Sequence, residues 1–166
     1  MNKLLTTLIA LLALSSIGLA FDFGLKGVVF KPEVWKLSEE TSFGFKGDMG
    51  FRLSNGFALN LGLTPTFNYK LPVGTVYAGP SLEVGLGGFV NPFAVGLKVG
   101  GTYTLAPGFS AHAEAGVYLL GDSGANFNIG GGYWINPCVS LGADLNFNTR
   151  PFGPSTSLTL GVRTSF

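Results

Sequence analysis

The sequence alternates between large apolar residues and small or polar residues over most of its length. The pattern is sharpest from 42 to 53, where every second residue from Phe43 to Leu53 is apolar or glycine. The last ten residues, Ser157 to Phe166, show it again. A period of two is typical of a β-strand, because successive side chains of a strand point to opposite faces. The chain is therefore predicted to be an all-β protein.

Nine segments carry this alternation, and each is predicted to form a strand. They span approximately 21–30, 42–53, 57–70, 75–86, 93–105, 109–120, 125–135, 139–148 and 157–166. Residues that favour turns separate them, among them Ser54-Asn55-Gly56, Ala106-Pro107-Gly108 and Asn136-Pro137. The segment lengths suit strands that cross a membrane at a tilt, which need about 9–11 residues.

Charged residues provide a test of this assignment. When the apolar face of each segment is set by its large apolar residues alone, all eleven charged residues within the segments fall on the opposite face. If the two faces were equally favoured, this would happen roughly once in two thousand sequences, because each residue points to one of two sides. The eleven are Asp22, Lys26, Lys46, Asp48, Arg52, Lys70, Glu83, Lys98, Glu114, Asp144 and Arg163.

Glycine and aromatic residues indicate which face points inward. Most segment glycines share the charged face, and the exceptions are Gly27, Gly47, Gly101 and Gly131. Small residues suit the crowded concave side, so the polar face is predicted to line a lumen and the apolar face to meet lipid. Aromatic residues near segment ends fit interfacial girdles. They are Phe21, Phe43, Phe57, Tyr69, Phe93, Tyr103, Phe109, Tyr133, Phe147 and Phe166. A secreted soluble sandwich or lipocalin-like barrel is the alternative.

The composition supports a membrane barrel. Charged residues make up 11% and hydrophobic residues 46% of the chain, which argues against disorder. After residue 20 no apolar run is long enough for a spanning helix. A closed sheet is the other structure that satisfies its backbone in lipid. The net charge of +1 offers no basic surface for nucleic acid.

The first twenty residues are predicted to be a signal peptide. A short basic start at Lys3 precedes a mostly apolar run, and Gly18-Leu19-Ala20 supplies small residues for cleavage. An uncleaved anchor is the alternative. Residues 21–166 would then form one barrel domain. Cys138 is the one cysteine and is interpreted as a turn residue, so no internal disulfide is expected.

The segment from Gly130 to Phe166 resembles the end of a small eight-stranded outer-membrane β-barrel of the OmpA/OmpX type. It combines a strand, a tight Tyr-Trp-Ile-Asn-Pro turn, a second strand, a Pro/Gly loop from Thr149 to Pro154 and a closing strand. The resemblance implies an outer-membrane location, with lipid and the barrel assembly machinery as partners. It also implies that the alternating strand ending in an aromatic residue is the assembly signal. On this chain its apolar residues are Leu158, Leu160, Val162 and Phe166.

Eight strands are expected, because bacterial single-chain barrels have even strand numbers. Nine segments must then be reduced by one. In one alternative 42–53 is the first strand and 21–41 an extension. In the other, 21–30 is the first strand, Lys31 to Thr41 is a loop, and 57–92 holds one strand fewer than its pattern suggests. Trp35, within 31–41, is interpreted as part of a solvated loop or of a contact surface.

The inward charges predict a lumen closed by ion pairs. Six positive and five negative residues nearly balance, whereas a selective channel usually carries a ring of one sign. The predicted lumen network consists of Lys26, Lys46, Asp48, Arg52, Glu83, Lys98, His112, Glu114, Asp144 and Arg163. No cofactor is expected, and His112 lacks a second histidine or cysteine beside it to hold a metal.

The sequence therefore predicts a non-enzymatic outer-membrane barrel with a structural or surface-interaction role. A small passive channel is one alternative. The other is a lipid-modifying enzyme that uses Ser110, His112 and Glu114, which follow one another at every second position of one strand. Residues two apart on a strand are about 6.6 Å apart, which is long for direct hydrogen bonds, so an interior polar network is preferred.

Overall fold

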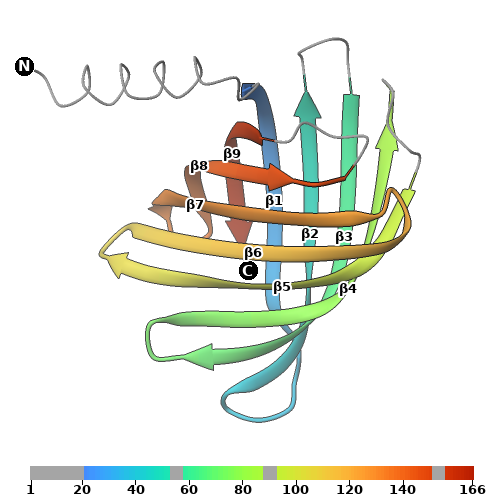
Figure 1. Ribbon diagram of the computed structural model, residues 1–166. Coiled ribbons are helices and arrows are strands. Elements are labelled where there is room, and N and C mark those ends of the chain that lie inside the picture. The colour runs from blue at the N-terminus through green and yellow to red at the C-terminus, as the bar shows by residue number, and fades with distance from the viewer. Residues whose placement is uncertain (1–20, 53–57, 88–92, 151–155) are drawn as a thin grey trace, which may run out of the picture.

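The computed structural model describes residues 21–52, 58–87, 93–150 and 156–166, except for the side chains of 21–23 and 52. Nine strands form one closed barrel (Figure 1). They are β1 (Phe21–Lys36), β2 (Thr41–Arg52), β3 (Ala58–Leu71), β4 (Gly74–Leu86), β5 (Phe93–Ala106), β6 (Phe109–Gly121), β7 (Gly124–Asn136), β8 (Val139–Asn148) and β9 (Thr156–Ser165). All nine predicted segments are strands, and the all-β closed barrel is confirmed.

The prediction of eight strands and of purely antiparallel pairing is wrong. Each strand pairs antiparallel with the next, but β1 and β9 close the barrel in parallel, from Phe21 opposite Thr156 to Phe30 opposite Ser165. With an odd number of strands the first and last must run in the same direction. A parallel ladder also satisfies the backbone groups of both edges, although slightly less favourably per residue, so closure does not demand an even count.

Residues 31–36 are neither a loop nor part of an N-terminal extension, because β1 continues through them to Lys36. The pairing with β2 shifts register between Lys31 and Trp35, which marks a bulge. The connection to β2 is only 37–40. There the Ser38 hydroxyl accepts hydrogen bonds from the backbone amides of Glu40 and Thr41. The sequence obscured this because Pro32 and several charged residues interrupt the alternation.

The two ends of the barrel differ in their connections. One end, called the turn end below, carries the two-residue turns 72–73, 107–108 and 137–138 and the last residues of β9. Gly108 has a φ of +79°, which favours glycine, and the Asn136 side chain accepts hydrogen bonds from the amides of Cys138 and Val139. The opposite end, called the far end, is where β1 begins. The predicted turn Ser54-Asn55-Gly56, the signal peptide and Phe57 lie outside the described residues.

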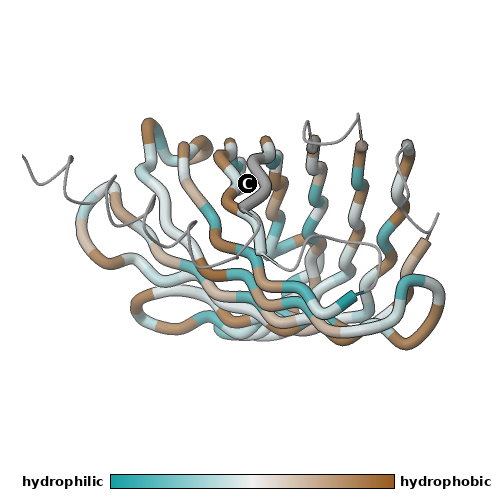
Figure 2. Tube along the Cα trace, turned by 45° about the horizontal axis from the view of Figure 1, so that its top comes forward, coloured by the Kyte–Doolittle hydropathy of each residue, from teal (hydrophilic) through white to brown (hydrophobic). Residues whose placement is uncertain are grey.

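The strands are strongly tilted around a narrow interior. Following the pairing once around the barrel returns to β1 about 12 residues from the starting point, a stagger that requires a steep tilt. Hydrophobic and hydrophilic positions alternate along the strands (Figure 2). A barrel of about eight strands has an interior that side chains just fill, so the inward side chains of these nine strands form the core.

The described residues contain no helix that is long and apolar enough to cross a membrane.

Candidate functional site in the barrel lumen

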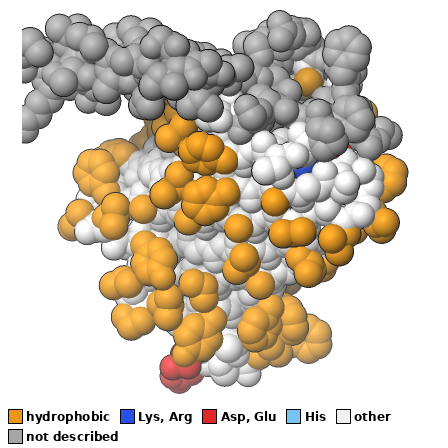
Figure 3. All heavy atoms as spheres, in the orientation of Figure 1, with side chains coloured by type: hydrophobic (Ala, Val, Ile, Leu, Met, Phe, Trp, Pro, Cys, Tyr) orange, Lys and Arg blue, Asp and Glu red, His pale blue; other side chains and the backbone are white. Residues whose placement is uncertain are grey.

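The described residues are apolar outside and polar inside. Fourteen polar or charged residues are buried, against four apolar ones, which are Val28, Tyr77, Ala94 and Tyr118. Thirty-three large hydrophobic residues are exposed, and hydrophobic side chains are spread over the visible face of the barrel (Figure 3). A soluble protein of this size buries its large apolar residues instead. The buried polar and charged side chains of the described residues are therefore concentrated in the lumen.

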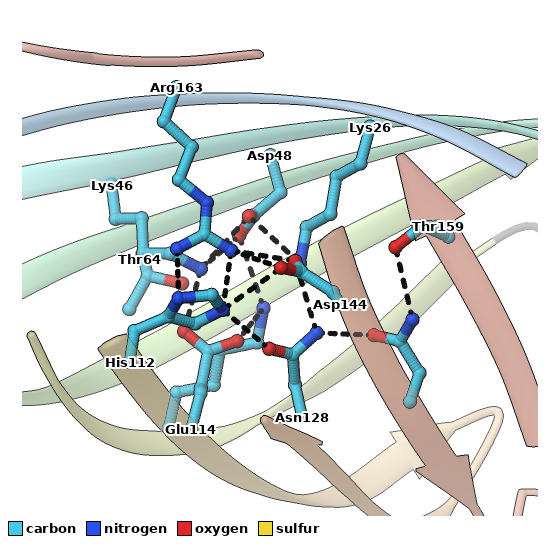
Figure 4. A network of polar contacts seen from close by, with 12 residues as sticks. Lys26, Lys46, Asp48, Thr64, His112, Glu114, Asn128, Asp144, Thr159 and Arg163 are labelled. Carbon is cyan, nitrogen blue, oxygen red and sulfur yellow. Dashed lines mark hydrogen bonds and ion pairs between the residues drawn. The ribbon is translucent and has the colours of Figure 1, made fainter. Parts of the chain in front are cut away.

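The central part of the lumen is organised by Lys46 of β2. Its ammonium group donates hydrogen bonds to both carboxylate oxygens of Asp48, at 2.8 and 2.9 Å, and to Oε2 of Glu114 at 2.6 Å (Figure 4). The Tyr77 hydroxyl donates to the same oxygen of Glu114 at 2.6 Å. Strands β2, β4 and β6 are thus joined across the lumen rather than through neighbouring strands alone.

A second group lies around Glu83 of β4. Lys98 Nζ is 3.1 Å from Glu83 Oε1 and also lies 3.4 Å from Asp48 and 3.6 Å from Glu114, which links this group to Lys46. Arg150 Nη1 donates to Glu83 Oε2 at 2.6 Å. The Tyr118 hydroxyl also donates to Glu83.

Arg150 enters the lumen from the segment that follows β8. Its Nε donates to Asp122 at 3.0 Å, and its guanidinium lies 4.3 Å from the centre of the Tyr118 ring. Burial lowers the pKa of Arg150, but the carboxylates of Glu83 and Asp122 raise it, and the net pKa lies above its ordinary value. Arg150 therefore acts as a fixed positive charge that covers the Glu83 group toward the far end.

A third group joins β6, β7, β8 and β9. Arg163 Nη2 donates to both oxygens of Asp144, at 2.6 and 2.7 Å, and its guanidinium lies against the imidazole of His112. His112 Nε2 is 3.1 Å from both Asp144 Oδ1 and Asn128 Oδ1. Lys26 of β1 is 3.7 Å from both Asp48 and Asp144 and so connects this group with the first.

The described lumen charges balance. Five basic side chains and five carboxylates make ion pairs with one another, with His112 counted as neutral. The bases are Lys26, Lys46, Lys98, Arg150 and Arg163, and the acids are Asp48, Glu83, Glu114, Asp122 and Asp144. Removing one member of such a buried set leaves an uncompensated charge, which is strongly unfavourable.

Nine of the ten residues predicted for the lumen network lie in this connected set. The tenth, Arg52, has a side chain outside the described part, as has Asp22. Lys70 is on the same face but is exposed at the turn end. The sequence analysis missed Arg150 and Asp122, because both lie between strands, where alternation gives no direction. Charge balance could not have pointed to them either, because adding one base and one acid leaves the difference unchanged.

Inward glycines make room for the network at two places. A Cβ atom on Gly130 would lie 2.4 Å from an Asp144 carboxylate oxygen and 2.6 Å from Cε1 of His112. A Cβ atom on Gly100 would lie 2.5 Å from the Tyr77 hydroxyl oxygen. At these two positions the missing side chain leaves space that polar side chains of neighbouring strands occupy.

The row Ser110, His112 and Glu114 does not form a hydrogen-bonded chain among the described contacts. Ser110 accepts a hydrogen bond from Trp134 Nε1 at 3.0 Å, while His112 and Glu114 bind the partners given above. Likewise, the described residues contain no group of three histidine, cysteine, aspartate or glutamate side chains arranged to hold a metal ion. The contacts support a structural polar network at this row.

The residues predicted to form the assembly signal lie on or beside β9. Leu160 and Val162 are about half exposed on the outer face, and Leu158 is partly exposed on the same face. Phe166 directly follows β9, is 64% exposed, and its amide donates to the Phe30 carbonyl at 3.1 Å. Their role in assembly stays a prediction.

The described part of the barrel contains two cavities in the lumen, one on each side of the network. The cavity toward the far end has a volume of about 190 Å³ and the cavity toward the turn end about 120 Å³. Lys26, Glu114 and Asn128 line both. The charged network is therefore the partition between two chambers.

No protein-family model and no curated protein sequence matches the chain. A solved structure from a study of the in-meso crystallization of membrane proteins aligns with a TM-score of 0.38 and 16% sequence identity, over 81% of this chain and 77% of that chain. Similarity at this level supports no conclusion about what the chain does.

Proposed function

We propose that this protein is an integral outer-membrane β-barrel, without enzymatic activity, whose lumen is closed by the charge network. Its role is structural or one of surface interaction. The observation that carries the proposal is the inverted distribution of residues, with fourteen polar or charged residues among the buried ones and the large hydrophobic residues outside. That distribution is stable in lipid and unfavourable in water.

The exposed leucines and the position of the exposed aromatic residues support contact of the outer surface with a bilayer. Leu105 and Leu119 are each 71% exposed, and leaving such side chains in water forgoes about 1.5–3 kcal/mol apiece. Exposed aromatic residues gather near both ends of the strands, with Tyr103, Phe109 and Tyr133 toward the turn end and Phe93 and Phe147 toward the far end. Aromatic belts at both interfaces are typical of membrane barrels.

The outer membrane is the proposed location for two reasons. The first is the predicted signal peptide over 1–20, and the second is the apolar face of the closing strand, which ends at Phe166. Outer-membrane lipid and the barrel assembly machinery are the proposed partners. The chain resembles OmpA/OmpX-type barrels in this strand but has nine strands.

The pairing of opposite charges across the lumen supports the proposal that it is closed. The central group of Lys46, Asp48 and Glu114 spans from β2 to β6, and Lys98 extends it to β5. An ion that passes must displace these contacts, and no ring of one sign within the described residues would attract it.

The test is expression of the full chain in a Gram-negative host, followed by fractionation and reconstitution. We expect a heat-modifiable folded band in the outer-membrane fraction and little steady conductance in planar bilayers. A folded, soluble periplasmic protein would overturn the membrane assignment. A large, stable, ion-selective conductance would replace the closed barrel with a channel. Loss of a lipid A modification in a folded His112→Ala variant would instead favour an enzyme.

A further inference from the structure

The cavity toward the turn end combines an apolar wall with a positive floor. Phe30, Tyr77 and Trp134 contribute aromatic side chains to its lining, and the rings of Phe30 and Tyr77 are 5.2 Å apart. Val28, which is 6% exposed, adds an aliphatic surface. Mostly apolar cavities with a few converging polar groups are the usual form of small-molecule sites.

The charges on this lining do not balance, although those of the whole lumen do. Lys26, Lys46 and Arg163 line the cavity, whereas Glu114 is its only lining carboxylate in the described part of the barrel. Asp48 and Asp144, which pair with these bases, do not line it. The lining itself therefore holds more basic than acidic groups, but Lys46 and Arg163 are already bound to carboxylates by short hydrogen bonds.

Among the bases that line this cavity, Lys26 has the most unused hydrogen-bond donors. Its ammonium group is 3.7 Å from Asp48 and from Asp144, and it makes no hydrogen bond with another described residue. Lys46, in contrast, makes three short hydrogen bonds to carboxylate oxygens, from 2.6 to 2.9 Å. An ammonium group has three donors, so Lys26 can donate to an acceptor in the cavity without giving up a hydrogen bond.

From these contacts we propose that the turn-end cavity binds a small aromatic carboxylate, with the carboxylate against Lys26 and the ring against the aromatic side chains of the lining. The cavity measures about 120 Å³, less than the about 150 Å³ of an apolar cavity that binds benzene, so a single ring is the largest apolar group that it can hold. Ser110 accepts a hydrogen bond from Trp134 and retains its own hydroxyl proton, which can be donated to the ligand.

The cavity toward the far end has a different lining, which predicts that the anion binds in the turn-end cavity. It is lined by Asn60, Asn126, Asn146 and Asn148 and by more carboxylates than bases, with Asp48, Glu83, Glu114 and Asp122 facing Lys26, Lys98 and Arg150. Its aromatic lining residues, Phe51, Phe127 and Phe147, lie on the outward-facing side of their strands, so their rings are directed away from the lumen. The same anion should therefore bind on one side of the network only.

The test uses the full chain folded in a non-ionic detergent, with Trp35→Phe as the background. This leaves Trp134, which lines the cavity, as the sole tryptophan of the two in the chain. Sodium benzoate is titrated against Trp134 fluorescence, with free N-acetyltryptophanamide in the same micelles as the correction for direct quenching. Benzamide, which has nearly the same shape but no charge, is the matched ligand. We expect saturable benzoate binding that is at least tenfold tighter than benzamide binding.

Two variants locate the charge that matters. Lys26→Gln should weaken benzoate binding at least tenfold, while Lys70→Gln, which removes an exposed base near the same end, should leave it unchanged. No saturable signal, equal affinity for the two ligands, or unchanged benzoate affinity in Lys26→Gln would each overturn the proposal. If Lys26→Gln does not fold, the proposal is tested by comparing benzoate and benzamide binding to the Trp35→Phe protein, whose lumen is unaltered. Membrane location is not at issue in this test, since folded protein in detergent suffices.

Discussion

The inner and outer faces of a single strand show how differently the two sides of this barrel are built. On β3 the inward Thr64, Thr66 and Asn68 are at most 1% exposed, whereas the outward Leu63 and Phe67 are 51% and 45% exposed. Adjacent residues therefore face different surroundings. The inner side is stabilised by directional contacts between charged groups and hydroxyls. The outer side depends on the surrounding medium, which is proposed to be lipid. A substitution should act according to its face rather than its position along the strand.

The largest effect is expected from a broken ion pair in the lumen. Glu114→Ala removes the carboxylate shared by Lys46, Lys98 and Tyr77 and leaves buried positive charge without a partner. The free energy of unfolding in lipid vesicles should fall by about 3–5 kcal/mol, measured by urea titration. The control is Glu39→Ala, an exposed residue in the β1–β2 connection, which should change little. Equal effects of the two would contradict the network.

Glu114→Ala should also change the permeability of the lumen to ions. Because Glu114 belongs to the partition between the two cavities, a folded Glu114→Ala barrel should leak ions in planar bilayers where the parent does not. A tight barrel that is merely less stable would show that the remaining side chains close the lumen without this carboxylate.

The next largest loss of stability is expected from a charge placed on the outer face. Leu160→Lys places a charge on an outward residue near the middle of β9, which is 54% exposed. In a bilayer this should cost about 2–4 kcal/mol at mid-depth, measured by the same unfolding titration. Leu160→Ala is the control for lost side-chain size. A cost for lysine no greater than that for alanine would argue that this face does not meet lipid.

Adding a methyl group to a glycine should also affect the two faces differently, but with a smaller change in stability. Gly130→Ala should lower the free energy of unfolding by about 1–3 kcal/mol, because the added methyl group meets the Ala143 carbonyl oxygen as well as His112 and Asp144. The matched variant is Gly47→Ala, whose Cβ would meet nothing within 4 Å, and its effect should stay within about 0.5 kcal/mol. Equal losses at both positions would indicate that backbone freedom, not lumen crowding, explains the inward glycines.

Alternation was enough to predict the strands and which side of each faces the lumen, because both depend on neighbouring residues. The side chains of Lys46 and Glu114 could be assigned to the lumen in this way, but not to each other, since their pairing depends on register around several strands. The strand count failed for a related reason. Whether 21–36 joins the barrel depends on its fit against β9, a contact between opposite ends of the sequence. Arg150 and Asp122 lie outside any alternation and were missed.

The smallest change in stability is expected at the end of the closing strand, although its effect in cells should be clear. Deleting Phe166 removes one backbone hydrogen bond, from its amide to the Phe30 carbonyl at 3.1 Å, and an aromatic ring that is 64% exposed. One such bond contributes about 0.5–1.5 kcal/mol, so the refolded variant should be only slightly less stable. If Phe166 is part of the assembly signal, the amount of folded protein in the outer membrane should nevertheless fall severalfold, with degradation in the periplasm. The control is Phe166→Tyr, which keeps a terminal aromatic residue and should restore the yield. A normal yield of heat-modifiable protein from the deletion would show that the outward face of β9 is recognised without its last residue.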